Sequence, residues 1–490
     1  MSHTLTLPEP PLIWRRFYEL SRIPRESKKE DRAVEWLIHT GKALGCTVET
    51  QPLAGQDRPY FANVLLRKPA TPGRESHPTV VLQAHIDMVC EKNEGCAHDF
   101  ATDPIALRIV GDNMWATDTT LGADNGIGLC AALAALEDPE LEHGPLEVLI
   151  TVDEEAGMTG ARKLQPNWLK GEYLFNLDSE EEGFATISCA GALDSTGSLK
   201  LHLQQPPAGQ ICLALKVRGL KGGHSGIEIG KGLGNANKVL AEVLTALSAL
   251  ATLTLAKVKG GNKRNAIPRE ATAVFFVRPE KQQALLAEVD ACASRICSRL
   301  QDIDPGLTIT LAADEATEVM SSGDAAAILS TLNALPHGVE CWSRVVEGQP
   351  ETSTNLAMCD TRDGLFEVNL LSRSNVEPAK RALADTIAAI FAGHGLTCRE
   401  GNDYPGWEPA PESELVRLLK LTHQKTFGTG IQIVSIHAGL ECGLIGQNYP
   451  EMQMISIGPD MWGPHTPEEH VSIPSVANFW KLLRACLAAV

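Results

Sequence analysis

Short apolar runs alternate with helical segments over the first third of the chain, and this alternation restricts the possible folds more than any other feature. The runs "PTVVLQAH", "LEVLITV" and "YLFNLD" are nearly continuous and of strand length, and the helical pattern "GIGLCAALAALED" lies between the first two. Short strands that are apolar on both faces are typical of a sheet covered by helices on both sides. Residues 12 to 180 therefore predict an α/β domain.

A different order of elements follows from about residue 186 to 400. Strand, helix, two strands, helix and strand appear in turn, and a similar series follows, which favours an α+β domain of two related halves. Direct sequence similarity between the halves is weak, so the repeat is a hypothesis. The chain of 490 residues is too long for one hydrophobic core. We predict one domain formed by residues 1–185 and 401–490, interrupted by a second domain at 186–400.

The composition excludes several classes of partner. The formal net charge is −18 and no long run of Lys and Arg occurs, which argues against nucleic acid and anionic membranes as main partners. The N-terminal residues lack the apolar core of a signal peptide, and no segment approaches the roughly 20 uncharged apolar residues that span a bilayer. The 13 cysteines are dispersed, without a C-x-x-C pair, as expected for reduced thiols. We expect a soluble cytoplasmic protein.

Polar residues stand at the ends of the predicted strands. His85 and Asp87 are two residues apart, so in an extended segment they point to the same side. A carboxylate in that position can accept the ring N–H and orient the other nitrogen toward a cation. A buried His–Asp pair with a purely structural role explains the same two residues equally well.

Four acids are further candidates, three of which also follow predicted strands. They are Asp124 in a Gly-rich turn before a helix, Glu154 and Glu155 after "LEVLITV", and Asp178 after "YLFNL". His465 lies in a Gly/Pro-rich loop after a later strand. Open α/β sheets bind ligands beyond the carboxyl ends of their strands. Taken singly, the acids are explained by helix capping and His465 by a solvated loop.

Together these acids would repel one another strongly. If neighbouring carboxylates lay about 5 Å apart, each pair would cost about 3 kcal/mol at an effective dielectric constant of about 20. Such a cluster must bind protons, stay apart or hold cations. Two imidazoles and several carboxylates suit zinc or another first-row divalent metal, and two ions that share one carboxylate fit the number of acids better than one.

A family resemblance rests on motifs that run from about residue 80 to 470, namely "AHIDMV", "TLGADNGIG", "EEAGMTGA", "NLDSEEEG", "GLKGGHSG", "RNAIPREA", "IHAGLECG" and "SIGPDMWGPHTPEE". Together they resemble the aminoacyl-histidine dipeptidases, the bacterial cytosolic nonspecific dipeptidases, within the di-zinc family that also holds carboxypeptidase G, acetylornithine deacetylase and peptidase T. The resemblance implies an α/β, di-zinc aminopeptidase-like catalytic domain with a mixed sheet flanked by helices. The inserted α+β domain would be a lid of two related halves.

The resemblance also implies a role for each polar residue of the first domain. The implied metal ligands are His85 and Asp178 for one zinc ion, Glu155 and His465 for the other, and Asp124 as the bridge. Asp87 would orient His85, and Glu154 would be the general base that takes a proton from the bridging water. In this family the peptide bond after the bridging aspartate, here Asp124–Asn125, is typically cis.

The motifs that would bind substrate are less specific than those of the metal ligands. In the wider family a histidine in the motif of His224 reaches the carbonyl oxygen of the scissile bond, in related dimers from the other subunit. A guanidinium suits the carboxylate of a free dipeptide. Arg373 and Arg278 are the candidates, and we favour Arg373. The remaining substrate-binding candidates are Asn265, Gly439 and Glu441.

We therefore predict a zinc metallopeptidase that hydrolyses dipeptides, preferentially Xaa-His dipeptides including β-Ala-His. Its cofactors would be two Zn²⁺ per chain, with Co²⁺ or Mn²⁺ as substitutes, and a homodimer is expected by analogy. An N-acyl amino acid deacylase or a carboxypeptidase with the same metal chemistry is the main alternative. A non-catalytic metal- or peptide-binding protein is a further one, although the presence of Glu154 argues against it.

Overall fold

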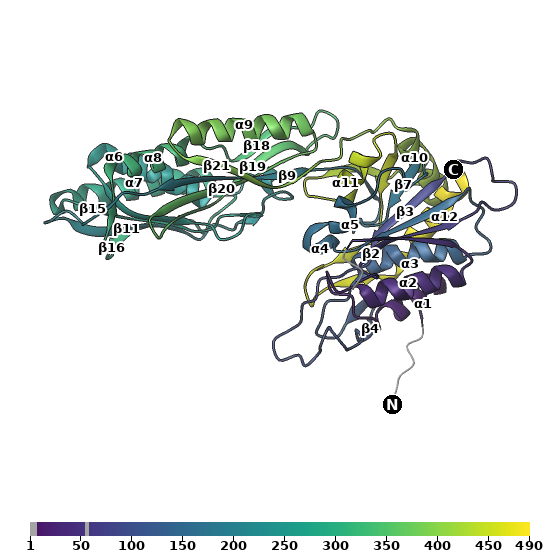
Figure 1. Cartoon of the computed structure of the whole chain (residues 1–490). Helices are drawn as coiled ribbons and strands as arrows, with labels where there is room; N and C mark the ends of the chain where they lie inside the picture. The colour runs from purple at the N-terminus through teal and green to yellow at the C-terminus, as the bar shows by residue number, and fades with distance from the viewer. Residues whose placement is uncertain (1–6, 54–57) are drawn as a thin grey trace. The chain divides into compact units, whose positions relative to one another are not determined.

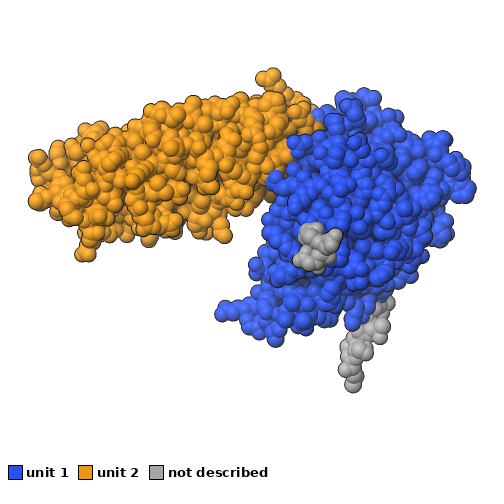
Figure 2. Space-filling view, viewed as in Figure 1, with its two compact units in different colours: residues 1–188, 409–435, 440–490 blue, residues 189–408, 436–439 orange. Residues whose placement is uncertain are grey.

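The protein forms two compact units in a computed structural model that describes residues 7–53 and 58–490 (Figures 1 and 2). The first unit comprises Met1–Ser188, Pro409–Ser435 and Leu440–Val490, and the second comprises Cys189–Glu408 and Ile436–Gly439. The second unit thus begins at 189 and its long segment ends at 408, against 186 and 400 for the inserted domain expected from the sequence. The domain limits themselves stay a prediction.

The first unit contains an eight-stranded sheet with helices packed against it. Its elements are α1 (Pro11–Leu20), α2 (Asp31–Ala43), β1 (Thr47–Pro52), β2 (Ala62–Lys68), β3 (Val80–His85), β4 (Leu107–Val110), β5 (Asn113–Ala116), α3 (Ala123–Glu137), β6 (Leu146–Thr151), α4 (Glu154–Gly157), α5 (Thr159–Arg162), β7 (Tyr173–Asn176), β8 (Phe184–Cys189), α10 (Glu414–Phe427), β22 (Gln432–Ile436), α11 (Glu441–Asn448), β23 (Gln453–Ser456), β24 (Met461–Trp462), β25 (His470–Ser472) and α12 (Ile473–Ala489).

The strand order of this sheet is β1-β2-β6-β3-β7-β23-β8-β22. Its centre is parallel, because β3 pairs in parallel with both β6 and β7, and the flanking β1-β2 and β2-β6 pairs are antiparallel. Every residue of β3 and β6 is buried, as the continuous apolar runs predicted. Helix α3 packs on β3 and is buried along its whole length except for its last residue, which explains its apolar composition on all sides.

The second unit contains a nine-stranded sheet with helices. Its elements are β9 (Gly191–Lys200), β10 (Leu203–Gln204), β11 (Ile211–Arg218), β12 (Gly223–His224), η1 (Ile229–Lys231), α6 (Ala236–Leu250), β13 (Thr254–Gly260), β14 (Ala266–Ile267), β15 (Ala271–Val277), η2 (Pro279–Lys281), α7 (Gln282–Leu300), β16 (Thr308–Ala313), β17 (Val319–Met320), α8 (Ser322–Ala334), β18 (Gly338–Trp342), β19 (Pro350–Arg362), β20 (Leu365–Ser374), α9 (Glu377–Gly393) and β21 (Thr397–Tyr404).

The order of strands in the second unit confirms the two related halves. The main path is β16-β11-β15-β13-β19-β20-β9-β21. In chain order the first half reads β11, α6, β13, β15, α7, β16, and the second reads β9, α8, β19, β20, α9, β21. The two halves therefore share one topology, and their strands follow in mirrored order across the β13–β19 pair.

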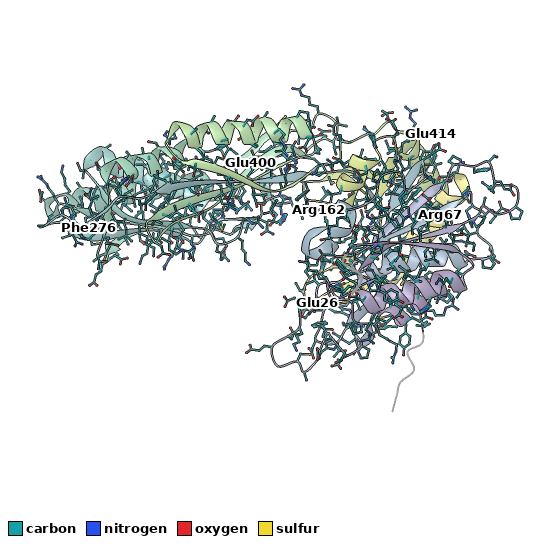
Figure 3. All side chains as sticks on the ribbon, in the orientation of Figure 1. Glu26, Arg67, Arg162, Phe276, Glu400 and Glu414 are labelled. Atoms are coloured by element: carbon teal, nitrogen blue, oxygen red, sulfur yellow. The ribbon has the colours of Figure 1, made fainter. Side chains whose placement is uncertain are left out.

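Charged side chains lie on the surface, and the cysteines are free thiols. Charged side chains such as Glu414 on α10 and Glu400 on β21 are exposed on their respective units (Figure 3). All 13 cysteines lie in the described residues and none of them forms a disulfide. Within residues 7–53 and 58–490, no helix has the length and apolar character needed to cross a membrane.

Candidate active site

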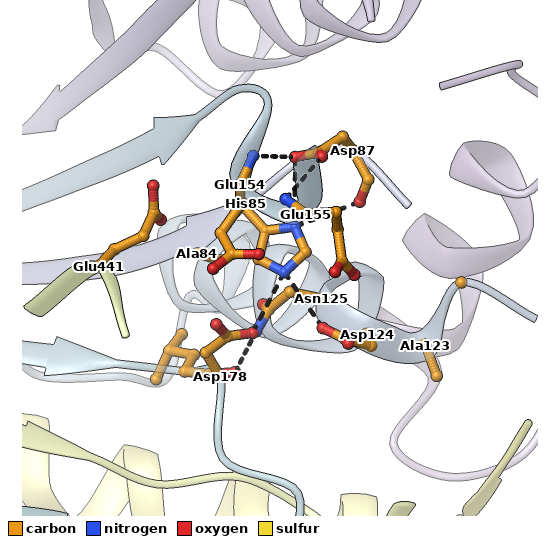
Figure 4. A network of polar contacts seen from close by, with 12 residues as sticks. Ala84, His85, Asp87, Ala123, Asp124, Asn125, Glu154, Glu155, Asp178 and Glu441 are labelled. Atoms are coloured by element: carbon orange, nitrogen blue, oxygen red, sulfur yellow. Dashed lines mark hydrogen bonds and ion pairs between the residues drawn. The ribbon is translucent and has the colours of Figure 1, made fainter. Parts of the chain in front are cut away.

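Three adjacent strand ends bring a histidine and three acids to one edge of the sheet in the first unit. Because β3 runs parallel to β6 and β7 on either side, the carboxyl ends of these strands lie together. His85 is the last residue of β3, Glu154 and Glu155 open α4 just after β6, and Asp178 follows β7 by two residues (Figure 4). The parallel sheet thus explains why residues far apart in sequence meet here.

The carboxylate of Asp124 lies between two imidazoles. Its Oδ1 is 3.1 Å from Nε2 of His85, and its Oδ2 is 3.3 Å from Nε2 of His465. The same His85 nitrogen is 3.4 Å from Oδ1 of Asp178, and the same His465 nitrogen is 3.0 Å from Oε2 of Glu155. The structure therefore brings together all five predicted metal ligands, with Asp124 in contact with both imidazoles.

The start of α3 has an irregular backbone that presents Asp124. Asp124 and Asn125 have non-helical backbone angles, and the peptide bond between them is cis, as the family resemblance implied. The amide of Asn125 donates to the backbone carbonyl of Leu177 at 3.0 Å and to the carboxylate of Asp178. The start of α3 is thereby tied to the residues that follow β7.

Asp87 links the histidine of β3 to the acids after β6. Its buried carboxylate lies 3.4 Å from Nδ1 of His85. It also accepts the backbone N–H groups of Glu154 at 3.0 Å and Glu155 at 3.2 Å, and the hydroxyl of Ser27 at 2.7 Å. A carboxylate in this position orients the imidazole and fixes the start of α4 at the same time.

The pKa values of the cluster show a strong mutual influence. Burial raises the pKa of Glu154 well above its usual value, and it also raises the pKa of Glu155. Hydrogen bonds to Asp124 and Glu155 raise the pKa of His465 to about 11. Burial alone would lower the pKa of His85, but Asp178 and Asp124 raise it well above its usual value. Protons on the imidazoles compensate the carboxylates, and cations bound at the same atoms would replace those protons.

The donor set fits a divalent metal. Ligand atoms of His85, Asp124 and Glu155 all lie within 4.8 Å of one another. Oε1 of Glu155 is buried and has no hydrogen-bond partner among the described residues, so it is a carboxylate oxygen free to bind a cation. Imidazole nitrogens and carboxylate oxygens are typical ligands of zinc and of other first-row divalent ions.

In the second unit, the ring of His224 is held in one orientation. Its Nδ1 accepts the backbone N–H groups of Gly226 at 3.2 Å and Ile227 at 3.1 Å. Burial, followed by the charge of Arg373, lowers the pKa of His224 to about 4. A neutral ring whose Nδ1 is an acceptor carries its proton on Nε2, which leaves that nitrogen as a donor.

The two arginine candidates occupy different environments in the second unit. Arg373 on β20 is 5% exposed, and its buried Nε has no hydrogen-bond partner in the described part of the chain. Its Nη1 lies 3.4 Å from the hydroxyl of Tyr404. The side chain of Arg278 is 76% exposed and contacts Glu280 only at 4.0 Å. The buried, incompletely satisfied guanidinium of Arg373 is the better candidate for a carboxylate ligand.

Two other predicted substrate-binding positions of the second unit, Gly439 and Asn265, lie near Tyr404 and His224 respectively. A Cβ atom at Gly226 would lie 3.1 Å from Nε of Arg373, and one at Gly439 would lie 3.0 Å from the hydroxyl of Tyr404. The backbone carbonyl of Asn265 accepts the N–H of Ser225 at 2.9 Å, next to His224, while the Asn265 side chain is exposed.

Glu441 belongs to the first unit and is fully buried. Its Oε2 accepts hydrogen bonds of 2.6 Å from the side chains of Gln83 and Thr151. Burial raises its pKa to about 7. In this structure Glu441 supports the ends of β3 and β6, and its contact with substrate stays a prediction.

Sequence reasoning missed several polar residues that contact predicted site residues, or the backbone beside them, within the same unit. They are Arg25, Ser27, Gln83, Thr151, Tyr404 and Glu469. Glu469 lies within the motif "GPHTPEE", but two adjacent acids after a proline do not reveal which one is buried. Arg25 lies in a polar, charged segment that resembles an exposed loop, so no pattern distinguishes it.

The fold and the site define the class of the protein. Residues 215–303, in the second unit, match the M20 family described as "Peptidase dimerisation domain". The aminopeptidase PepT from Bacillus cereus covers 99% of both chains with a TM-score of 0.57 and 16% sequence identity, which shows a common fold alone. The chain combines a mixed sheet flanked by helices, this inserted domain, and imidazoles and carboxylates at the strand ends. These features define a metallopeptidase of the M20 type.

Two similar proteins narrow the class further. The cytosol non-specific dipeptidase of Escherichia coli (strain K12) is 42% identical over 486 residues, which cover 99% of this chain and 98% of that protein. The crystal structure of aminoacylhistidine dipeptidase from Vibrio alginolyticus is 39% identical, covers 100% of this chain and 98% of that chain, and has a TM-score of 0.92. The chain belongs to this family of M20 dipeptidases, which confirms the predicted family, fold class and enzyme class.

Proposed function

We propose that the protein hydrolyses dipeptides, preferentially Xaa-His dipeptides including β-Ala-His, with water activated at a two-zinc centre. The position of the Asp124 carboxylate between Nε2 of His85 and Nε2 of His465 is the observation that carries the proposal. A single carboxylate with one oxygen toward each imidazole suits a bridge between two cations. The name of the Escherichia coli relative supports dipeptides as substrates, and the name of the Vibrio alginolyticus dipeptidase supports histidine as the second residue.

The proposed ligands divide into two sets that share Asp124. His85 and Asp178 would hold one ion, and Glu155 and His465 the other. Each imidazole already lies within 3.4 Å of its partner carboxylate. When bound, Zn²⁺, or Co²⁺ or Mn²⁺ in its place, supplies Lewis-acid activation of water and of the peptide carbonyl.

Glu154 is the proposed general base. It opens α4 directly beside Glu155, and Asp87 accepts its backbone N–H, so its position is fixed from the backbone. Burial raises its pKa well above the usual range, which makes its carboxylate a better proton acceptor. Glu154 would take a proton from water as the water oxygen bonds to the peptide carbon. The C–N bond then breaks, and Glu154 passes that proton to the leaving amine.

Groups of the second unit are proposed to bind the dipeptide. Nε2 of His224 is a donor in the neutral ring and suits the carbonyl oxygen, on which negative charge develops during attack. Arg373 has a buried N–H without a partner among the described residues and suits the free carboxylate of the substrate. Gly439, Asn265 and Glu441 are proposed as further substrate-binding positions on the resemblance alone.

A substrate panel tests this function against its alternatives. The panel contains β-Ala-His, Gly-His, dipeptides without histidine, tripeptides and N-acetyl amino acids, each assayed with zinc-loaded protein. We expect the highest kcat/KM on Xaa-His dipeptides. A preference for N-acetyl amino acids would assign a deacylase, and release of C-terminal residues from longer peptides would assign a carboxypeptidase. Zinc binding without turnover of any substrate would assign a binding protein.

The assembly and location are further parts of the proposal. The match of residues 215–303 to a peptidase dimerisation domain supports a homodimer, which sedimentation equilibrium would test. The name of the Escherichia coli relative, a cytosol non-specific dipeptidase, supports a cytosolic location.

A further inference from the structure

The carboxylate of Glu469 holds the turn that presents Asp124. Its Oε2 accepts the backbone N–H groups of Leu121 at 2.7 Å and Gly122 at 2.9 Å. Its Oε1 accepts those of Ala123 at 2.7 Å and Asp124 at 3.3 Å. Four consecutive N–H groups therefore point at one buried carboxylate, which is 2% exposed.

These N–H groups have no other local partner. They belong to the start of α3, where the first N–H groups of a helix cannot bond within the helix. The N-cap residue Gly122 provides no side-chain hydrogen bond, and the backbone angles of Asp124 and Asn125 depart from the helix. A negative charge is also favourable at the amino end of a helix. Glu469 thus replaces the missing cap from a distant part of the sequence.

Arg25 holds the same turn through one of its backbone carbonyls. Its buried guanidinium donates to the backbone carbonyl of Gly122 at 2.5 Å. It also donates to the carbonyls of Ile86 at 2.9 Å and Asp87 at 3.0 Å, which follow His85 at the end of β3. A Cβ atom at Gly122 would lie 2.3 Å from Nη2 of Arg25, and the φ angle of +71° at this position also favours glycine. An anion at its N–H groups and a cation at one of its carbonyls therefore both hold the turn.

The position of Glu469 also couples two proposed ligands. Glu469 and His465 lie in the same connection between β24 and β25. His465 approaches Oδ2 of Asp124 through its side chain, while Glu469 holds the backbone N–H of the same residue. Both oxygens of Glu469 are occupied by N–H groups, so Glu469 is not itself a metal ligand.

From this arrangement we infer that Glu469 is a positioning residue, which fixes Asp124 relative to His465 and so sets the affinity of the metal centre. The inference rests on the proposed metal site. Carboxylates that orient a metal ligand typically change metal affinity by 10–100-fold when they are replaced. In Glu469→Gln, an amide NH₂ would face two of the backbone N–H groups, so half of the contacts would be lost without a change in side-chain size.

The test compares Glu469→Gln, Glu469→Asp and the control Glu468→Gln with the wild type. Glu468 is the adjacent, exposed acid. Zinc dissociation constants are measured by chelator competition, the ligand geometry from the absorption spectrum of the Co²⁺-loaded protein, and folding from far-UV circular dichroism. We expect 10–100-fold weaker zinc binding and an altered Co²⁺ spectrum for Glu469→Gln, a smaller change for Glu469→Asp, and wild-type values for Glu468→Gln.

A folded Glu469→Gln protein with wild-type zinc affinity and Co²⁺ spectrum would overturn the inference. If Glu469→Gln does not fold, Glu469→Asp decides in the same way. Failure of the wild-type protein to bind zinc would instead contradict the proposed metal site. The two failures are therefore distinguishable.

Discussion

Oδ1 of Asp87 accepts the backbone N–H of Glu154 at 3.0 Å, so the carboxylate that orients His85 also fixes the proposed general base. This contact joins the end of β3 to the start of α4. The ligand geometry and the position of the base therefore depend on one buried side chain, and both should respond when it is changed.

Replacement of Asp87 by asparagine is expected to weaken zinc binding and turnover together. An asparagine keeps one acceptor but turns an NH₂ donor toward a backbone N–H or toward His85. We predict a loss of 10–100-fold in zinc affinity, measured by chelator competition, with a fall in kcat on β-Ala-His. Wild-type zinc affinity in the folded variant would contradict the role given to Asp87.

Replacement of Glu154 by glutamine is expected to separate chemistry from metal binding. Glu154 is not among the proposed ligands, so its loss should remove proton transfer and leave the zinc content unchanged. We predict a fall in kcat of about 10²–10⁴-fold. Zinc content measured by atomic emission on the same sample is the control, and a matching loss of zinc would remove the assignment of Glu154 as the base.

Arg373 is expected to determine the affinity for substrates with a free carboxylate. In Arg373→Met the charge and the fork of donors are lost, and we predict a decrease of kcat/KM on β-Ala-His of about 10–100-fold, or about 1.4–2.7 kcal/mol. Arg278→Met is the matched control, because that side chain is 76% exposed, and it should keep wild-type kinetics. Equal effects of the two substitutions would contradict the choice of Arg373.

The second unit is expected to lose stability in acid through His437. This histidine is 4% exposed and lies 2.7 Å from the hydroxyl of Ser353, and burial, followed by the charge of Arg373, lowers its pKa to about 3. The unfolded chain, with a histidine pKa near 6.5, binds the extra proton first. The stabilising contribution is therefore complete above about pH 6.5 and is lost as the pH falls toward 3, with a slope of up to about 1.4 kcal/mol per pH unit.

The variant His437→Asn tests this dependence. Urea unfolding of the variant and the wild type between pH 4.5 and 7.5 gives the free energy of unfolding at each pH. The wild type should lose more stability than the variant as the pH falls, because only the wild type gains that proton on unfolding. Parallel pH profiles of the two proteins would contradict the lowering of the His437 pKa by burial.

The sequence predicted those parts of the fold that are apolar and continuous. The runs that became β3, β6 and β7 have six or four consecutive buried residues, and the polar residues at their ends lie at the site. The long strands β9 and β19 were not predicted. Their polar residues, among them Ser195, Ser353 and Thr354, are buried between neighbouring strands, so neither strand shows an apolar or alternating pattern.

The same limit applies to the site. Asp124 and His465 could be chosen because glycines and prolines surround them and because a family resemblance covers their motifs. Arg25 and Glu469 act through backbone groups of a turn that is remote in sequence. A backbone N–H or C=O group is common to almost every residue and does not identify the side chain that contacts it, so no pair of residue types in the sequence reveals these contacts.

The most direct test of the central claim is a zinc titration of the chelator-treated protein, with turnover of β-Ala-His and zinc content followed together. Activity should be absent from the metal-free protein and should rise to its maximum at two zinc ions per chain. Full activity without metal would contradict the two-zinc dipeptidase. Alanine variants of His85, Asp124 and His465 that still bind two zinc ions and reach full activity would also contradict it, because the metal would then lie elsewhere.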